Sequence, residues 1–220
     1  DTVSTAAPEY AKYVINCIDG SFKDGTARIY VKGGTFCFDP ADKPEASEIT
    51  YVADGYVSVA DGENYEVVPA VAEADGKYYA TLGEAVAAVH EKTGEDRMAG
   101  TTIKLLRDAS GGGIGAGYKT IEDGTTQGND PVKFTLDLGG HTYTVSNPTV
   151  GSAGTETNGF QLLKDSVVTI QNGAIKTSLT NIIFQNYCNL TLKDVQVEAP
   201  DAWCVMSNNC GDVNFIGNTS

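Results

Sequence analysis

The sequence lacks any apolar run that approaches the roughly 18 residues needed to cross a bilayer as a helix. It opens with DTVSTAAPEY, which has neither the basic segment nor the apolar stretch of a signal peptide. Positive charge is scarce, since 15 Lys and Arg stand against 29 Asp and Glu and give a formal net charge of −14. Such a chain repels phosphate backbones and anionic lipid headgroups. We therefore expect neither nucleic-acid binding nor membrane insertion.

Signals for cofactors are also missing. The five cysteines are too few for a disulfide scaffold and lack the CxxC spacing of zinc sites, so we interpret them as small apolar residues in strands. The Gly-rich stretch SGGGIGAGYKTIEDGTTQGND lacks the GK[ST] ending of a phosphate loop, and we interpret it as a surface loop. No EF-hand or nonapeptide Ca²⁺ repeat is present. We predict no cofactor and keep a Ca²⁺-dependent module, which rests on the acidic loops alone, as an open alternative.

What the sequence does contain is a repeat of about 22 residues. Three segments with the order apolar, polar, apolar align with one another, at 168–173, 190–195 and 213–218. Their equivalent apolar residues are separated by 22 residues (170 to 192) and by 23 (192 to 215). Each period also holds a second short apolar run, at 160–163, 182–185 and 203–206. The period therefore predicts at least two short strands per repeat.

Short strands joined by Gly and Asn turns cannot bury their apolar faces as flat units, whereas coiling covers each face with its neighbours. We therefore predict a parallel β-helix in which equivalent residues of adjacent rungs stack about 4.8 Å apart. Turn residues such as Asn172, Asn189 and Asn209 suit left-handed backbone geometry and can form side-chain ladders. An ordinary antiparallel sandwich is the alternative, although no clean two-residue hairpin links strands of equal length.

Three stretches carry a family resemblance: FTLDLGGHTYTV, NGFQLLKDSVVTIQNGAIKT and IIFQNYCNLTLKDVQVE. They resemble the pectate-lyase-like repeats of surface proteins of gut bacteria and of virion proteins of their phages. The resemblance implies an all-β fold, a right-handed parallel β-helix or solenoid, and a location on the virion, outside the cell or on the cell surface. It is compatible with a homotrimer, which is common among phage spikes. It leaves the function open, because the same fold hosts lyases, hydrolases, adhesins and spikes.

We expect three parts in the chain. The stretch YVINCIDGSFKDGTARIYVKGGTFCFDPAD resembles the closing rungs of such a solenoid, so residues 1–70 are predicted to be closing rungs and an exit segment. Residues 71–131 form a connector with the Gly-rich loop, and residues 132–220 begin a second β-helix. This second array has no polar cap. We therefore expect that it was cut from a longer chain or that another subunit covers its last rung.

The connector predicts the one short α-helix of the fold. Thr81 and Glu84 have the spacing of a capping box. Four apolar residues then fall on one helical face: Leu82, Ala85, Val86 and Val89. We expect this helix to cap the first rung of the second array.

Catalytic candidates are few. A lyase on this scaffold needs Ca²⁺ ligands and a basic residue, and a hydrolase needs paired carboxylates. No Arg follows Arg107. The carboxylates that could serve a hydrolase are Asp137, Asp194 and Asp212, and each is equally well explained as a solvated turn residue.

Binding candidates come from aromatic and sulfur side chains. Tyr118, Tyr187 and Trp203 could stack on sugar rings, but core packing explains them as well, and we expect Trp203 to be half buried in a strand. Cys188 and Cys210 lie 22 residues apart (188 to 210), so the register predicts that they come within disulfide reach.

These observations predict a non-catalytic structural or adhesive protein of a phage virion, as a fibre, spike or decoration protein, or of a bacterial cell surface. Its expected partners are a surface glycan or other surface proteins of the virion or cell. The alternative is a polysaccharide lyase or glycoside hydrolase on a β-helix scaffold.

Overall fold

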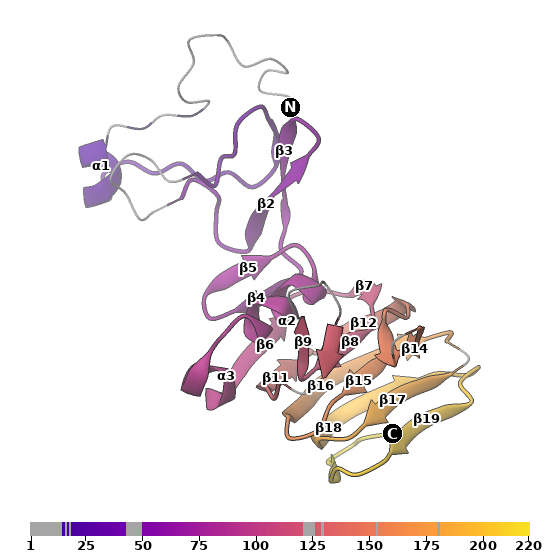
Figure 1. Cartoon of the computed structure of the whole chain (residues 1–220). Helices are drawn as coiled ribbons and strands as arrows, with labels where there is room; N and C mark the ends of the chain where they lie inside the picture. The colour runs from indigo at the N-terminus through magenta and orange to yellow at the C-terminus, as the bar shows by residue number, and fades with distance from the viewer. Residues whose placement is uncertain are drawn as a thin grey trace. The chain divides into compact units, whose positions relative to one another are not determined.

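The computed structural model describes residues 15, 17, 19–42, 50–120, 126–128, 130–152, 154–179 and 181–220 (Figure 1). The chain divides into two compact units. Unit 1 comprises residues 1–70 with 78–80, and unit 2 comprises residues 71–77 with 81–220. Parts of the predicted closing rungs (1–14 and 43–49) and of the predicted Gly-rich loop (121–125 and 129) lie outside the described residues.

Unit 1 contains one helix, α1 (Asp19–Asp24), and three antiparallel strands in the order β1-β3-β2. The strands are β1 (Gly34–Phe36), β2 (Tyr56–Asp61) and β3 (Asn64–Pro69), and β5 (Lys77–Tyr79) spans the border between the units. A two-residue turn joins β2 to β3, and its Gly62 has φ of 62°, in the left-handed region that favours glycine. Among the described residues of unit 1, a small buried cluster contains Phe22, Val31, Phe36, Tyr51, Val52 and Val67.

Unit 2 holds the longer part of the fold. Its helices are α2 (Leu82–His90) and α3 (Gly94–Ala99). Its strands are β4 (Ala72–Ala74), β6 (Thr101–Leu105), β7 (Ala109–Gly112), β8 (Ile114–Ala116), β9 (Tyr118–Thr120), β10 (Thr126–Gly128), β11 (Lys133–Asp137), β12 (Thr142–Asn147), β13 (Val150–Ser152), β14 (Thr155–Asn158), β15 (Phe160–Leu162), β16 (Val167–Thr177), β17 (Ile182–Asn186), β18 (Asn189–Glu198), β19 (Cys204–Asn208) and β20 (Val213–Ile216).

Two sheets of unit 2 contain long runs of parallel strands. The first has the order β20-β18-β16-β11-β6-β4, in which only the β6–β4 pair is antiparallel, and β12 adds parallel pairs with β16 and β7. The second has the order β19-β17-β15-β8 and is parallel throughout. Figure 1 shows β15, β17 and β19 side by side in the C-terminal part of the chain. Apolar side chains from both sheets form the core of unit 2.

The register of these strands is the one that the sequence alignment predicts. Ile170 pairs with Leu192 and Leu192 pairs with Phe215. The turn that follows the aligned segments also repeats, because Asn172, Asp194 and Gly217 have φ of 58°, 52° and 67°. These residue types tolerate the left-handed region better than others, which explains why the turn recurs at that position.

The predicted fold class is nevertheless wrong. The described strands form five separate sheets, of which one is parallel, one mixed and three antiparallel, and they do not close into a single right-handed β-helix. The predicted closing rungs are the antiparallel sheet of unit 1, and β9–β10 and β13–β14 are further antiparallel pairs. The physical reason is that alternation of apolar and polar residues is the same in parallel and antiparallel strands. The period revealed neighbouring strands but could not show that the chain closes into a coil.

The prediction of a single helix also fails, since the described residues include α1, α2 and α3. The helix that was predicted is α2, and its capping box is confirmed. The Glu84 backbone N–H donates to Thr81 Oγ1 at 3.1 Å, and the Thr81 N–H donates to the Glu84 carboxylate at 3.3 Å. All four residues of the predicted apolar face are buried, and α2 packs against β4, β6, β7 and β8.

The Gly-rich stretch is not simply a surface loop, because β7 and β8 lie within it. Its glycines permit close packing. A Cβ at Gly111 would lie 2.7 Å from the Tyr143 hydroxyl, and a Cβ at Gly115 would lie 2.6 Å from the ring of Tyr118. Both distances are shorter than real Cβ contacts, so larger residues would push these partners away. Glycine here serves the packing of strands against aromatic rings.

Candidate functional site

An open polar groove of about 430 Å³ lies on the outer surface of unit 2, over β7, β12 and β16. It is lined by Asp108, Ala109, Ser110, Thr142, Thr144 and Lys176. We call these six residues the polar groove. Apart from Ala109, every residue that lines it carries a hydroxyl, a carboxylate or an ammonium group.

Strand alternation places these polar side chains on the outside. On β12 the side chains of Tyr143 and Val145 are buried, and those of Thr142 and Thr144 between them point to the other face. The Tyr143 hydroxyl donates to the carbonyl oxygen of Gly112 at 2.8 Å, and burial raises the pKa of Tyr143 to about 12. The buried ring therefore fixes β12 against β7 beneath the groove.

The parallel register aligns the groove residues in a row across four strands. Ser110 on β7 pairs with Thr144 on β12, and Thr144 pairs with Lys176 on β16. Lys176 in turn pairs with Glu198 on β18, which extends the row beyond the groove. Neighbouring residues in such a row lie about 4.8 Å apart, a spacing that lets one extended ligand contact several of them.

Charged groups lie at both ends of this row. At one end, the Thr142 backbone N–H donates to Asp108 Oδ1 at 2.8 Å, and His141 Nδ1 lies 3.6 Å from the same oxygen. At the other end, Lys176 Nζ lies 2.8 Å from Glu198 Oε2. This bond to Glu198 raises the pKa of Lys176. The lysine therefore remains protonated at neutral pH and acts as a hydrogen-bond donor rather than as a base.

The groove is suited to binding and poorly suited to glycoside hydrolysis. Three hydroxyls and one ammonium supply donors, and carboxylates and hydroxyls supply acceptors, on an open and shallow surface. Asp108 is the carboxylate that lines the groove, whereas Glu198 lies beyond its far end and forms an ion pair with Lys176. Glycosidases place their two carboxylates about 5 to 9.5 Å apart. The residues that line the groove supply one carboxylate, whereas such an enzyme uses two.

Asp137, the first predicted catalytic residue, is a structural turn residue. It accepts hydrogen bonds from Gln171 Nε2 at 2.9 Å, Asn172 Nδ2 at 3.2 Å and the Gly139 N–H at 3.0 Å. Partial burial acts to raise the pKa of Asp137, but these hydrogen bonds outweigh it and hold the pKa below its usual value. The side chain is occupied in closing the turn after β11.

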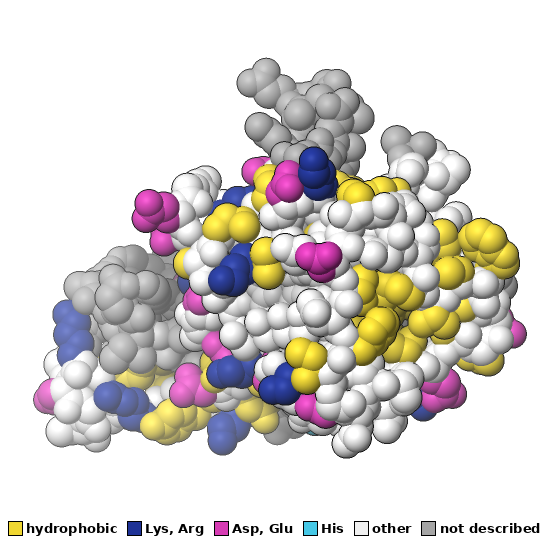
Figure 2. Space-filling model, turned by 90° about the horizontal axis from the view of Figure 1, so that it is seen from below, with side chains coloured by type: hydrophobic (Ala, Val, Ile, Leu, Met, Phe, Trp, Pro, Cys, Tyr) yellow, Lys and Arg dark blue, Asp and Glu magenta, His cyan; other side chains and the backbone are white. Residues whose placement is uncertain are grey.

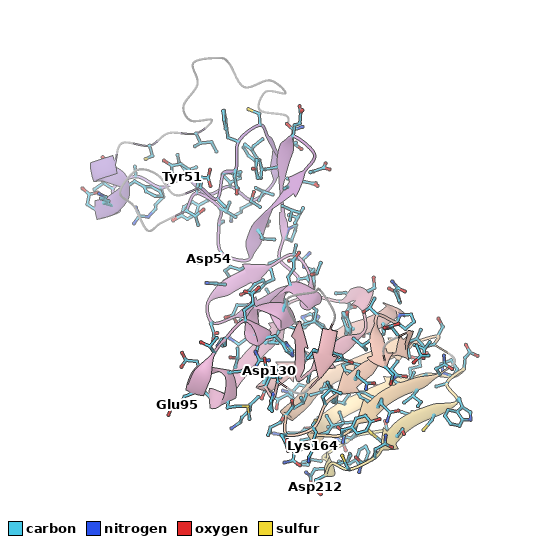
Figure 3. All side chains as sticks on the ribbon, in the orientation of Figure 1. Tyr51, Asp54, Glu95, Asp130, Lys164 and Asp212 are labelled. Atoms are coloured by element: carbon cyan, nitrogen blue, oxygen red, sulfur yellow. The ribbon has the colours of Figure 1, made fainter. Side chains whose placement is uncertain are left out.

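Asp194 and Asp212, the other two candidates, lie on neighbouring segments but at opposite ends of β20. Asp194 accepts from the Asn218 N–H at 3.0 Å, beyond the end of β20, and Asp212 immediately precedes the strand. Five residue steps along β20 separate the two positions, or about 16 Å. Figure 3 shows Asp212 at the outer margin of unit 2. The structure does not bring the three predicted carboxylates together.

The predicted aromatic residues are not part of the polar groove. Tyr118 is half-buried, its hydroxyl donates to the carbonyl of Gly151 at 3.4 Å, and burial raises its pKa to about 12. Tyr187 is also half-buried. Trp203 was expected to be half buried in a strand, but it precedes β19 and is 80% exposed. Of the three, only Trp203 offers a largely free aromatic face.

The predicted disulfide between Cys188 and Cys210 is not formed, and all five cysteines are free. The Cys188 Sγ contacts Asn186 Oδ1 at 3.3 Å, and the Cys210 Sγ contacts the carbonyl oxygen of Tyr187 at 3.7 Å. Burial raises the pKa of the Cys188 thiol to about 12, so it is protonated and unreactive at neutral pH.

The acidic loops of the sequence left a Ca²⁺-dependent module as an alternative prediction. Within the part of the chain that the structure describes, no group of three or more His, Cys, Asp or Glu residues is arranged to hold a metal ion. A second open pocket, of about 410 Å³, lies beside α3 and includes Asp75, Glu91 and Asp96. These three carboxylates are not arranged to hold a metal ion, and Asp75 forms an ion pair with Lys92.

Over the same described residues, no helix has both the length and the apolar character that crossing a membrane requires.

Comparisons with known proteins give no relative. No protein-family model, no curated protein and no solved structure matches this chain.

Proposed function

We propose that this chain is a non-catalytic surface protein, structural or adhesive, of a phage virion or a bacterial cell, and that it contacts glycans through the polar groove. The observation that carries the proposal is the row Ser110, Thr144, Lys176 and Glu198, which presents two hydroxyls, an ammonium and a carboxylate at strand spacing. Sugars present many hydroxyls on a narrow chain, and such a row can bind several of them at once. The resemblance of the repeats to surface proteins of gut bacteria and their phages supports the same proposal.

Charge also supports a neutral glycan as the ligand. The whole chain carries a net charge of −14, which disfavours polyanionic ligands at long range. The groove itself contains one lysine and one aspartate, so its local charges balance. A neutral polysaccharide meets no such repulsion.

The first test is binding to immobilised bacterial and host glycans, followed by calorimetry with the best neutral oligosaccharide. We expect Lys176→Ala and Thr144→Val to weaken binding at least about tenfold each, since each removes a hydrogen-bonding group from the row. Lys164→Ala is the matched control, because Lys164 is an exposed lysine outside the groove (Figure 3). Equal binding by all four proteins would contradict the proposed site.

The enzyme alternative is a polysaccharide lyase or glycoside hydrolase, and a cleavage assay on the bound glycan tests it. We expect the glycan to be recovered at its original length after long incubation. Shortened products that disappear with Asp108→Asn or Glu198→Gln would replace the proposal with catalysis. Antibody labelling of particles and cells from the source culture tests the location separately.

A further inference from the structure

Cationic side chains of this protein are accompanied by carboxylates. Figure 2 shows Lys and Arg side chains interspersed with Asp and Glu side chains on one face of the protein. Four cations of unit 2 form ion pairs with carboxylates: Lys92, Arg97, Lys104 and Lys176. Of these four, Lys176 is the one that lines the polar groove. The carboxylate that pairs with Lys176 therefore affects what the groove can bind.

That carboxylate belongs to Glu198, which lies outside the groove. Lys176 Nζ lies 2.8 Å from Glu198 Oε2, and both side chains are exposed. The two residues occupy paired positions on β16 and β18, so the backbone register makes their side chains neighbours. Glu198 is not among the residues that line the groove. The same lysine thus forms the ion pair and lines the groove.

The charges that act on Lys176 are negative. The hydrogen bond and the charge of Glu198 raise the pKa of Lys176, and the charge of Asp108 acts in the same direction. His141 Nδ1 lies 3.6 Å from Asp108 and adds a positive charge only when the imidazole is protonated. Two carboxylates therefore act on one ammonium, and the local balance of charge is negative once Glu198 is included.

Glu198 has a closer hold on the lysine than Asp108 has. The Asp108 carboxylate accepts the Thr142 N–H at 2.8 Å and lies beside His141, whereas the Glu198 carboxylate contacts the Lys176 ammonium directly. A ligand that approaches the ammonium must therefore share it with Glu198.

We propose that Glu198 determines which sugars the polar groove accepts, by excluding those that carry a carboxylate. This inference rests on the proposed glycan-binding function. A sugar carboxylate placed against Lys176 would lie close to Glu198, and the two like charges would repel each other. A neutral sugar hydroxyl can accept a hydrogen bond from Lys176 while the ion pair stays in place, because an ammonium has three donors. The groove therefore selects neutral hexoses against hexuronic acids.

The test compares neutral polysaccharides with the same polymers after their primary hydroxyls have been oxidised to carboxylates. The probes are a glucan, a mannan and a galactan, and the measured quantity is the ratio of the neutral to the oxidised affinity for the 220-residue chain. We expect the unchanged protein to prefer the neutral polymer at least about tenfold. Salt at about 1 M should reduce this ratio, because it screens exposed charges.

Glu198→Gln should lower the ratio at least about fivefold, by strengthening binding to the oxidised polymer. Adding Lys176→Ala to Glu198→Gln should remove this gain, because the gain depends on the released ammonium. Glu95→Gln is the matched control and should leave the ratio unchanged. Glu95 is an exposed residue of α3, and its replacement changes the net charge by the same amount (Figure 3). Circular dichroism shows whether each variant is folded.

The outcomes separate this inference from the proposed function. If the unchanged protein binds the neutral polymer and folded Glu198→Gln keeps the same ratio, the role of Glu198 is overturned and glycan binding stands. A gain that persists without Lys176, or equal binding of both polymers by the unchanged protein, has the same meaning. Binding of neither polymer by the unchanged protein would overturn the proposed function, and the role of Glu198 with it.

Discussion

Unit 1 and unit 2 bury their apolar residues in different ways. Among its described residues, unit 1 has a small buried apolar cluster and three antiparallel strands, two of which are joined by a tight turn. Unit 2 stacks equivalent residues of successive parallel strands, such as Leu136, Ile170 and Leu192, into a column. In unit 1 most of the sheet is formed between segments close in sequence, whereas every parallel pair in unit 2 joins segments separated by long connections.

This difference explains why the candidate site belongs to unit 2. A column of buried side chains fixes the position of every strand, and the residues between them then form an equally regular row on the outer face. The row Ser110, Thr144, Lys176 and Glu198 is the outer counterpart of the buried pair Tyr143 and Ile175. Regular burial on one face therefore produces a regular polar row on the other.

The largest effect is expected when one buried side chain of each unit is truncated to alanine. Ile170 is fully buried in the column, so we expect Ile170→Ala to cost about 2–5 kcal/mol of unfolding free energy in unit 2. Val67 is buried in unit 1, and Val67→Ala should cost about 2 kcal/mol there. Hydrogen exchange followed by mass spectrometry reports each unit separately.

Thr169→Ala is the control for the column, because Thr169 lies on the same strand and its side chain is only partly buried. We expect it to change stability by less than about 1 kcal/mol. If Ile170→Ala and Val67→Ala accelerated exchange equally in both units, the two cores would be one cooperative structure and the comparison would fail.

The next test compares two arginines. Arg97 of unit 2 is 7% exposed, and it donates to the carbonyls of Pro131 and Asp130 at 2.9 Å each and pairs with the Asp130 carboxylate at 3.1 Å. It thereby ties α3 to the segment before β11. We expect Arg97→Met to cost about 2–3 kcal/mol in urea unfolding, since buried acceptors lose their donor.

Arg28 of unit 1 is the counterpart of Arg97. It lies 5.4 Å from the centre of the Phe22 ring and donates to backbone carbonyls, but it is exposed. We expect Arg28→Met to cost less than about 1 kcal/mol. An equal loss for the two substitutions would show that burial is not what makes Arg97 important.

Several parts of the fold could be predicted from sequence because their signals are local. The capping box of Thr81 and Glu84 and the apolar face of α2 need only one turn of helix to be recognised. The pairing of Ile170 with Leu192 follows from an uninterrupted period. The antiparallel sheet of unit 1 was missed because its alternation is also compatible with parallel strands. The glycines of β7 and β8 suggested a loop because nothing local reveals that Tyr143 and Tyr118 pack on them.

The candidate site could not be predicted in the same way. Its row takes one residue from each of four strands, and the connections between these strands differ in length. No single motif contains it, and only the register assembles it. The predicted carboxylates were chosen by residue type, and type alone could not show that Asp137 is already occupied by Gln171 and Asn172. The sequence signal for such a site is a Ser, Thr or Lys that alternates with buried residues at the same register position of successive strands.

A smaller effect is expected at the helix caps of unit 2. Thr81 accepts the Glu84 N–H and caps α2, whereas Thr93, at the equivalent position of α3, makes no such bond. We expect Thr81→Ala to lower the unfolding free energy by about 1 kcal/mol and Thr93→Ala to have little effect. Thr81→Ser should keep most of the wild-type stability, because serine also has a hydroxyl that can accept the Glu84 N–H. If Thr93→Ala cost as much as Thr81→Ala, the side-chain bond would not be the cause.

The smallest effect at neutral pH, and one that grows in acid, is expected at His90. Its Nδ1 lies 2.8 Å from the Val86 carbonyl, and its Nε2 accepts the Gly117 N–H at 3.3 Å. Only the neutral ring can make both bonds. Burial lowers the pKa of His90, and the charge of Arg97 acts in the same direction. His90 therefore binds a proton more readily in the unfolded chain than in the folded chain.

Because the pKa of His90 is lower in the folded state, unit 2 should keep its full stability above the ordinary histidine pKa of about 6.5 and lose stability as the pH falls below it. Urea unfolding at pH 8 and at pH 5.5 measures this loss. His90→Gln should reduce the difference between the two values, whereas His141→Gln, at an exposed imidazole beside Asp108, should leave more of it in place. The ring of Phe134 packs against the imidazole of His90. The charge of Asp130 raises the pKa of His90 and so opposes the charge of Arg97. Asp130→Asn should therefore increase the loss of stability in acid. An unchanged pH dependence in His90→Gln would mean that other groups of unit 2 set its response to acid.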